Sequence, residues 1–121
     1  MDYKLEVVVV PVSDVDRAKA FYSEQMGFDV DHDSEPTEGV RVVQLTPPGS
    51  GCSVVIGTGL APMEPGSIKG LQLVVDDMDT AVADLGGRGL DVGEVQTLGG
   101  FKFVFFNDPD GNGWAVQEIK R

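Results

Sequence analysis

Apolar and polar positions along this chain follow first the alternation of a strand, then the spacing of a helix, and then strand-like runs again. The valine-rich run at residues 4–10 stops at a proline, as a strand would. Ser13 or Asp14 is placed to cap a helix whose apolar stripe reaches Met26, and Gly27 ends that helix. Further strands are predicted at residues 28–33, 40–46 and 52–57, separated by turns rich in Gly, Pro and Ser.

The same succession of elements returns in the second half of the chain. The pattern predicts a strand at residues 70–76, a helix at 78–85, and strands at 90–95, 101–107 and 113–119. Residues 58–69 have the Gly, Pro and Ser content of a linker between the two halves.

Three sequence matches show that the two halves are copies of one module. The pattern V-x-D-apolar-D-x-A-x-A occurs at residues 12–20 and again, 63 positions later, at 75–83. "GFDV" returns as "GLDV" and "PPGSGCSV" returns as "PDGNGWAV", both at an offset of 62. The sequence therefore predicts an α+β fold with one domain over residues 1–121, built from βαβββ modules at 1–57 and 70–121.

The segment "NDPDGNGW" resembles part of a calcium-binding loop and has to be separated from a tight turn. Its polar positions match places one, three and five of an EF-hand loop, but Ile119 stands at place twelve, where a bidentate Glu is required. Strands flank the segment in the prediction, whereas helices flank an EF-hand loop. The segment is therefore interpreted as a turn between two strands, shaped by Pro109 and Gly111.

Composition excludes some partners. The net charge of −11 on 121 residues makes nucleic acid and anionic membranes poor partners, since binding to either depends on Lys and Arg. No apolar run approaches the ~20 residues of a membrane span, and the start has no signal-peptide pattern. A single cysteine, Cys52, agrees with a reducing compartment. We expect a soluble cytoplasmic protein.

Two motifs in the same order resemble those of the vicinal oxygen chelate superfamily. They are the helix opening "PVSDVDRAKAFYSEQMGF" and the near-terminal "DPDGNGWAVQE". That superfamily includes glyoxalase I, extradiol dioxygenases, fosfomycin-resistance transferases and bleomycin-resistance proteins. The resemblance implies that the modules curl into a cup-shaped mixed β-sheet with the helices outside, and it leaves the chemistry open, because many activities use this scaffold.

The resemblance also indicates where a catalytic metal would be bound. The enzymes hold a divalent ion by side chains of the first and fourth strands of both modules, and the matching positions here are Val7, Ser53, Gly70 and Ala115. Three of these residues have no side-chain lone pair, and a lone serine hydroxyl is a poor ligand. Glu118 is expected on the opposite face of its strand. We therefore predict no family-type metal site and no cofactor.

Other reactive side chains give weaker signals. His32, the only histidine, has a place on its predicted strand that favours the inside of the cup, where it is a candidate acid or base. A single histidine near a strand end is more often a surface or packing residue. Asp29, Asp31 and Asp33 are expected to share the other face as a solvated acidic row. Cys52 is expected to pack beneath the helices.

Strand alternation groups a set of residues on the inferred concave face: Val7, Val9, Ser53, Val55, Gln72, Val74, Ala115 and Gln117. Apolar walls with a few neutral hydrogen-bonding groups are typical of small-molecule sites. Phe101 and Phe103 share one face of their strand with Phe105, where they either line the pocket or fill a core or dimer interface.

The sequence thus favours a protein, expected to be a homodimer, that binds an apolar or aromatic organic ligand without a catalytic metal. The alternative is an enzyme of the same superfamily, of the lyase, isomerase or dioxygenase type, that uses a relocated metal near His32, Gln44 or Glu118, or His32 alone as acid or base. A purely regulatory or scaffold domain is a third possibility. The sequence leaves open whether the cups close within one chain or across a dimer.

Overall fold

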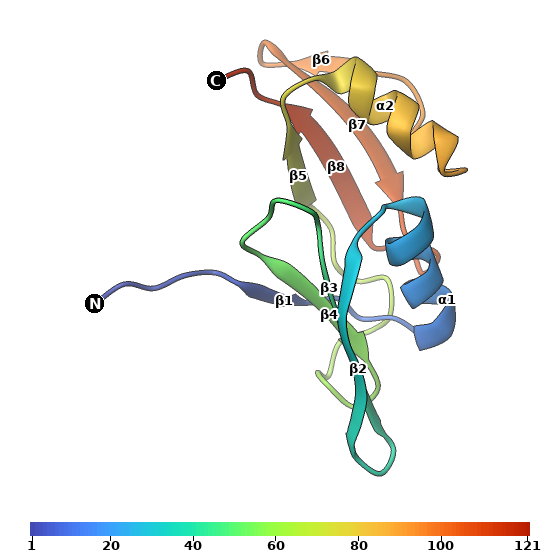
Figure 1. Ribbon diagram of the computed structural model, residues 1–121. Coiled ribbons are helices and arrows are strands. Elements are labelled where there is room, and N and C mark those ends of the chain that lie inside the picture. The colour runs from blue at the N-terminus through green and yellow to red at the C-terminus, as the bar shows by residue number, and fades with distance from the viewer.

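The computed structural model describes all 121 residues and contains two four-stranded mixed sheets, each accompanied by helix (Figure 1). The first sheet has the strand order β1-β4-β3-β2 and the second β5-β8-β7-β6. Each pairs its first and last strands in parallel and the others antiparallel, so the predicted tandem βαβββ arrangement is confirmed. The elements are β1 (Val7–Val9), α1 (Val15–Ala20), η1 (Phe21–Gln25), β2 (Asp29–Thr37), β3 (Val40–Thr46), β4 (Ser53–Gly57), β5 (Leu71–Val75), α2 (Met78–Gly87), β6 (Gln96–Leu98), β7 (Phe101–Asn107) and β8 (Gly113–Glu118).

Both helices begin in the same way, as the internal repeat requires. Asp14 caps α1 by accepting a hydrogen bond from the Arg17 amide at 3.1 Å, and Asp77 caps α2 by accepting one from the Thr80 amide at 3.2 Å. The two aspartates are 63 positions apart, the offset of the sequence repeat. A side-chain acceptor at this position satisfies an amide that the first helical turn leaves free, so the repeated aspartate fixes where each helix starts.

The first helix does not continue as a regular α-helix to Met26. From Phe21 to Gln25 it widens into a π-helical turn, which adds residues to the turn. The wider turn directs two consecutive aromatic side chains inward, with Phe21 6% and Tyr22 0% exposed. Their rings meet edge to face at 5.2 Å. Helical spacing alone allows only one of these neighbours to be central in the buried stripe.

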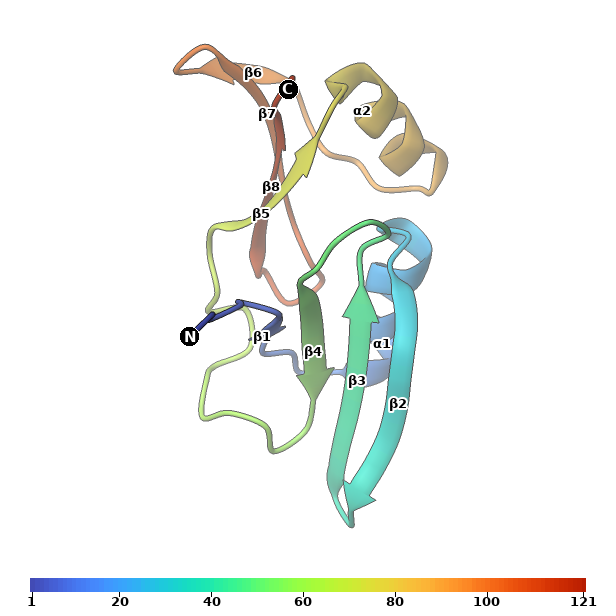
Figure 2. The ribbon, with the colours of Figure 1, turned by 60° about the vertical axis from the view of Figure 1, so that its left-hand side comes forward.

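The core lies between the helices and one face of each sheet. Strand positions that alternate toward the helices are buried, among them Val43, Leu45, Val104 and Val116. In both views α1 and α2 lie on the same side of the molecule and leave the other face of each sheet uncovered (Figure 2). These uncovered sheet surfaces are called the open faces below. Neither helix is long and apolar enough to cross a bilayer.

The loop between β7 and β8 ties the two modules together. The Asp108 carboxylate is 4% exposed and accepts the Tyr22 hydroxyl at 2.7 Å and the Asn112 side-chain amide at 2.8 Å. Its other oxygen accepts the backbone amides of Asp110 and Asn112. Asn112 also donates to the Pro11 carbonyl, 101 residues away, at 2.8 Å. The predicted strand-to-strand turn is present, and its polar side chains are structural contacts between modules.

Three predicted strands differ from those observed. The strand predicted at 90–95 is wrong: these residues form a loop, and the second strand of the module is β6, at Gln96–Leu98. Gly89 and Gly93 both have positive φ, and the Asp91 carboxylate accepts the Gly93 amide at 3.2 Å, which closes a turn. Leu90 and Val92 alternate because they pack that loop onto the core.

The other two differences concern strand length. β1 is shorter than predicted, and residues 1–6 form an exposed arm that projects away from the body (Figure 1). β2 is longer than predicted and reaches Thr37, because a register shift between Ser34 and Thr37 accommodates Pro36. This shift lets β2 and β3 form one long hairpin that ends at Gly39.

Candidate functional site

The open face of the first sheet is assembled by cross-strand pairing. Val7 pairs with Ser53, and Val9 pairs with Val55, so these four side chains share the face away from the helices. Gln44 pairs with Val55 and extends the same row into β3. Ser53 and Val55 are each 8% exposed, so they form the base of this face.

The open face of the second sheet is more apolar and more exposed. Ala115 pairs with Gln72 on one side and Phe105 on the other, and Gln117 pairs likewise with Val74 and Phe103. The Phe103 and Phe105 rings lie parallel, with an interplanar angle of 8° and centroids 5.9 Å apart. The Gln72 side chain donates to that of Gln117 at 3.1 Å. Two amides therefore lie beside a double aromatic platform, and both are on the side that the helices leave free.

Large apolar side chains are exposed in an unusual number on these two faces. Phe101 and Phe105 are both 44% exposed, Leu98 is 49%, Val74 is 45% and Val7 is 50%. All five lie on the strands, and none faces a helix. Contiguous exposed apolar surface of this kind marks a ligand site or an interface between proteins.

The four positions that correspond to the family's metal ligands do not fit a metal. Val7, Gly70 and Ala115 offer no donor atom, and Gly70 precedes β5 with a φ of +88°. The Ser53 hydroxyl is within hydrogen-bonding distance of Thr46, at 2.6 Å. No group of three or more His, Cys, Asp and Glu side chains in the structure is arranged to hold a metal ion.

Ser53 is the start of a short polar chain that crosses three strands. Its hydroxyl contacts the Thr46 hydroxyl, and the Thr46 hydroxyl in turn contacts the Asp31 carboxylate. Thr46 is half-buried and Asp31 is exposed, so the chain runs from the base of the open face toward solvent at β2. Sequence reasoning did not connect these residues, because the contact depends on a register shift between Val30 and His32.

The same shift overturns the expected acidic row. Asp31 lies on the open side with Thr46, whereas Asp33 points to the helix side, where it accepts the Lys19 ammonium at 2.7 Å and Arg41 at 2.9 Å. These hydrogen bonds, that of Arg41 foremost, hold the pKa of the Asp33 carboxyl well below its usual range. Arg41 also pairs with Asp16 of α1, so Asp33 belongs to a structural ion-pair network.

The residues expected to serve a relocated metal do not gather at one place. His32 is exposed and pairs with Gln44 on the open face of the first sheet. Glu118 lies in the second sheet and is 8% exposed. Its carboxylate points to the helix side, where it accepts a hydrogen bond from the Met78 amide at 2.8 Å. The expected orientation of Glu118 away from Ala115 agrees with this contact. An imidazole that acts as a general base also needs a neighbouring group to orient it. His32 lies on the outermost strand of the first sheet, which has a neighbouring strand on one side only.

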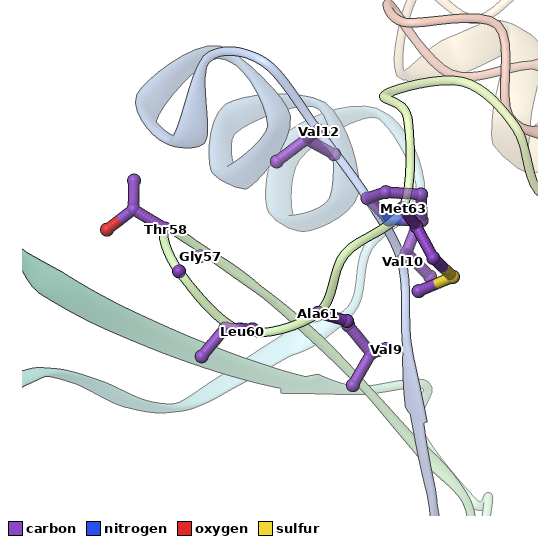
Figure 3. A pocket seen from close by; sticks show the side chains of 10 residues that line it. Val9, Val10, Val12, Gly57, Thr58, Leu60, Ala61 and Met63 are labelled. Atoms are coloured by element: carbon purple, nitrogen blue, oxygen red, sulfur yellow. The ribbon is translucent and has the colours of Figure 1, made fainter.

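Hollows in the surface adjoin the open faces without enclosing them. One of about 260 Å³ is lined by Val9 of β1 and by residues of the segment that follows β4, Leu60 and Met63 among them (Figure 3). Gly57 is needed there, since a side chain would come within 1.9 Å of the Arg41 carbonyl. A second hollow, of about 290 Å³, ends at Ala115 and Phe105.

The largest cleft lies on the helix side, between the modules. It has a volume of about 580 Å³ and acidic side chains at its rim, including Asp77 and Asp84. Asp77 caps α2 and Asp84 pairs with Arg88, while the Arg88 side chain packs against Gly27. These rim groups already have structural partners, so the open faces offer the freer hydrogen-bonding groups.

Residues 4–116 match the family model described as the Glyoxalase/Bleomycin resistance protein/Dioxygenase superfamily. The chain belongs to this family, as the two motifs and the tandem modules indicated. An uncharacterized protein of Bacillus subtilis (strain 168), YwkD, is 29% identical, and the match covers 85% of this chain and 87% of that protein.

Solved structures of other proteins have the same fold as this chain. TnmS3, an antibiotic binding protein from Streptomyces sp. CB03234, is 35% identical, with a TM-score of 0.86 over 98% of both chains. A glyoxalase/bleomycin resistance protein from the same organism is 36% identical, with a TM-score of 0.80 over 95% of this chain and 100% of that one. Relatives of this chain thus include a protein that binds an antibiotic.

Proposed function

We propose that this protein binds a small apolar or aromatic organic molecule, of the antibiotic type, on its open faces and without a catalytic metal. The observation that carries the proposal is the parallel Phe103–Phe105 pair beside the hydrogen-bonded Gln72–Gln117 pair. Flat aromatic surface with a few neutral hydrogen-bonding groups suits a ligand with a ring system and scattered polar atoms. The likeness to an antibiotic binding protein at 35% identity supports it.

The proposal includes a second copy of the chain. Ligand sites bury roughly 70–90% of a drug-sized molecule, and a single uncovered sheet face cannot do so. The two open faces carry exposed apolar side chains, such as Phe101 and Val74, that an opposing face would cover. A homodimer in which the open face of one module faces that of the partner's other module would enclose a ligand between them.

Titration of aromatic ligands into isotope-labelled protein tests the binding face. We expect amide shifts at Gln72 and Ala115, while helix-side residues remain unaffected. Phe103→Ala should weaken binding by about tenfold, which corresponds to the loss of one favourable aromatic contact. Val95→Ala is the matched control, because Val95 is 45% exposed in a loop outside the sheet faces. Shifts confined to the helix-side cleft would contradict the proposal.

The dimer is tested separately by sedimentation at several protein concentrations. Phe105→Glu places a charge on the exposed apolar face of the second sheet and should shift the equilibrium to monomer, whereas Val95→Glu should not. A monomer that binds ligand with full affinity would remove the second copy from the proposal and leave the binding face intact.

A further inference from the structure

The Ser53–Thr46–Asp31 chain has a fixed hydrogen-bond direction that sets which ligands the open face accepts. Asp31 ends the chain as a carboxylate, which has no proton to donate. The single hydroxyl proton of Thr46 therefore goes to Asp31. Thr46 has no proton left for Ser53, so the 2.6 Å contact between the two hydroxyls is a bond that Ser53 donates and Thr46 accepts.

This direction determines what remains free for a ligand. The Ser53 proton is used within the chain, so its oxygen meets a ligand only as an acceptor. Asp31 is exposed and its second oxygen also only accepts. All free positions of the chain thus accept hydrogen bonds, and none donates.

The amide pair on the second sheet behaves differently. Gln72 donates one of its amide protons to the Gln117 oxygen at 3.1 Å. The Gln117 nitrogen and the Gln72 oxygen remain free, so this pair offers both a donor and an acceptor. The amide pair can therefore orient a polar ligand, but it does not discriminate between ligand groups that donate and those that accept. That discrimination comes from the Ser53–Thr46–Asp31 chain on the first sheet.

We infer that Ser53, Thr46 and Asp31 form a polar subsite that selects ligands with a hydrogen-bond donor, a hydroxyl or an N–H group, and rejects carbonyl, ether or anionic groups at that place. The inference rests on the proposed function and names the class of ligand within it. Of the three residues only Ser53 is buried, at 8% exposure, and a ligand that presents an acceptor there leaves the Ser53 oxygen unpaired and faces the charged Asp31 with a second acceptor. The overall charge of −11 disfavours an anionic ligand in addition.

The subsite is tested with 1-hydroxypyrene and 1-methoxypyrene, which differ by one methyl group on the oxygen and share the same flat ring system. Near neutral pH the wild-type protein should bind the hydroxyl compound about tenfold more tightly than the ether, the effect of one hydrogen bond to a charge-terminated chain. 1-Pyrenecarboxylate, which is anionic, should bind more weakly than either.

Asp31→Asn removes the carboxylate that sets the direction, and Thr46→Val breaks the chain. In both variants the preference for the hydroxyl compound should fall to about twofold or less. Asp29→Asn is the matched control: Asp29 lies on the same strand, pairs with Thr46 in register and is exposed, and its change removes the same charge. This control should keep the preference of the wild type, and melting curves confirm that each variant is folded.

The outcomes separate the two levels of the proposal. Equal binding of hydroxyl compound and ether by the wild type overturns the donor-selecting subsite and leaves small-molecule binding in place. A preference that survives in Asp31→Asn, or disappears equally in Asp29→Asn, overturns it as well. Absence of binding by all three pyrenes overturns the proposed function, and the subsite with it.

Discussion

Replacement of Asp108 by Asn is the most demanding test of how the modules are held together. The carboxylate accepts four hydrogen bonds: two from backbone amides, one from Tyr22 and one from the Asn112 side chain. In Asp108→Asn the amide oxygen can still face the two backbone amides. The new NH₂ group then faces Tyr22 and Asn112, where two donor groups meet.

The expected loss of stability follows from these contacts. The two hydrogen bonds from the backbone amides change from charged to neutral and weaken by about 1 kcal/mol each, and the two from Tyr22 and Asn112 are lost at a cost of about 1–3 kcal/mol each. Removing a buried charge recovers part of this, because the carboxylate no longer has to be desolvated. We expect a net loss of about 3 kcal/mol, or roughly 12 °C in melting temperature for a chain of this size.

Urea unfolding followed by Trp114 fluorescence measures this loss. Trp114 is 4% exposed and donates to the Tyr22 hydroxyl at 3.0 Å, so it reports on the same network. Asp91→Asn is the control, because Asp91 is exposed and accepts only the Gly93 amide; it should change stability by about 0.5 kcal/mol or less. If the two variants differ by less than about 1 kcal/mol, the loop does not join the modules as argued.

Three further outcomes are expected. Burial, together with the hydrogen bond to Asp108, raises the pKa of Tyr22 far above its usual value. The neutral hydroxyl therefore stabilises the fold, and this stabilisation is fully present below about pH 10 and is lost as the pH rises further. In Tyr3→Phe, which leaves Tyr22 as the only tyrosine, tyrosinate absorbance should therefore appear only when the protein unfolds, and earlier ionisation in folded protein would contradict this. The lowered pKa of Asp33 means that its carboxylate stabilises the fold above about pH 4, and that this stabilisation is lost as the pH falls through the folded-state pKa. Asp33→Asn should therefore lower the free energy of unfolding by about 1 kcal/mol at neutral pH, and the difference from wild type should vanish in strong acid. An unchanged difference in acid would argue against the ion pair. Protein purified without chelator should contain no stoichiometric nickel, zinc, iron or manganese by elemental analysis, and a stoichiometric metal would favour the enzymatic alternative.

Much of the fold follows from short-range features of the sequence. The repeated aspartates predict both helix starts, because a cap depends only on residues within one turn. Alternation along β4 and β8 assigns Ser53 and Ala115 to the uncovered side, because successive strand residues point to opposite faces. The family relation follows from motif order along nearly the whole chain.

Predictions failed where one local irregularity changes the outcome. Leu90 and Val92 alternate like a strand, yet the glycines around them impose a loop, and periodicity does not distinguish the two cases. The register shift after Val30 separates Asp31 from Asp33, although strict alternation groups them. A single extra residue in a strand reverses the face of every residue that follows it, and the sequence contains no clear signal for it.

The sequence by itself determined the tandem modules, the helix caps, the apolar character of the uncovered strand faces and the lack of donor atoms at three of the family's four metal positions. Only the tertiary structure decided that Asp108 contacts the distant Tyr22, and that its partner Asn112 contacts Pro11. It alone also decided that Ser53, Thr46 and Asp31 form one directed chain of hydrogen bonds. The physical reason is range. Caps and alternation depend on neighbours within a few positions, whereas these contacts join separate strands and loops whose register is set by the packing of the whole domain.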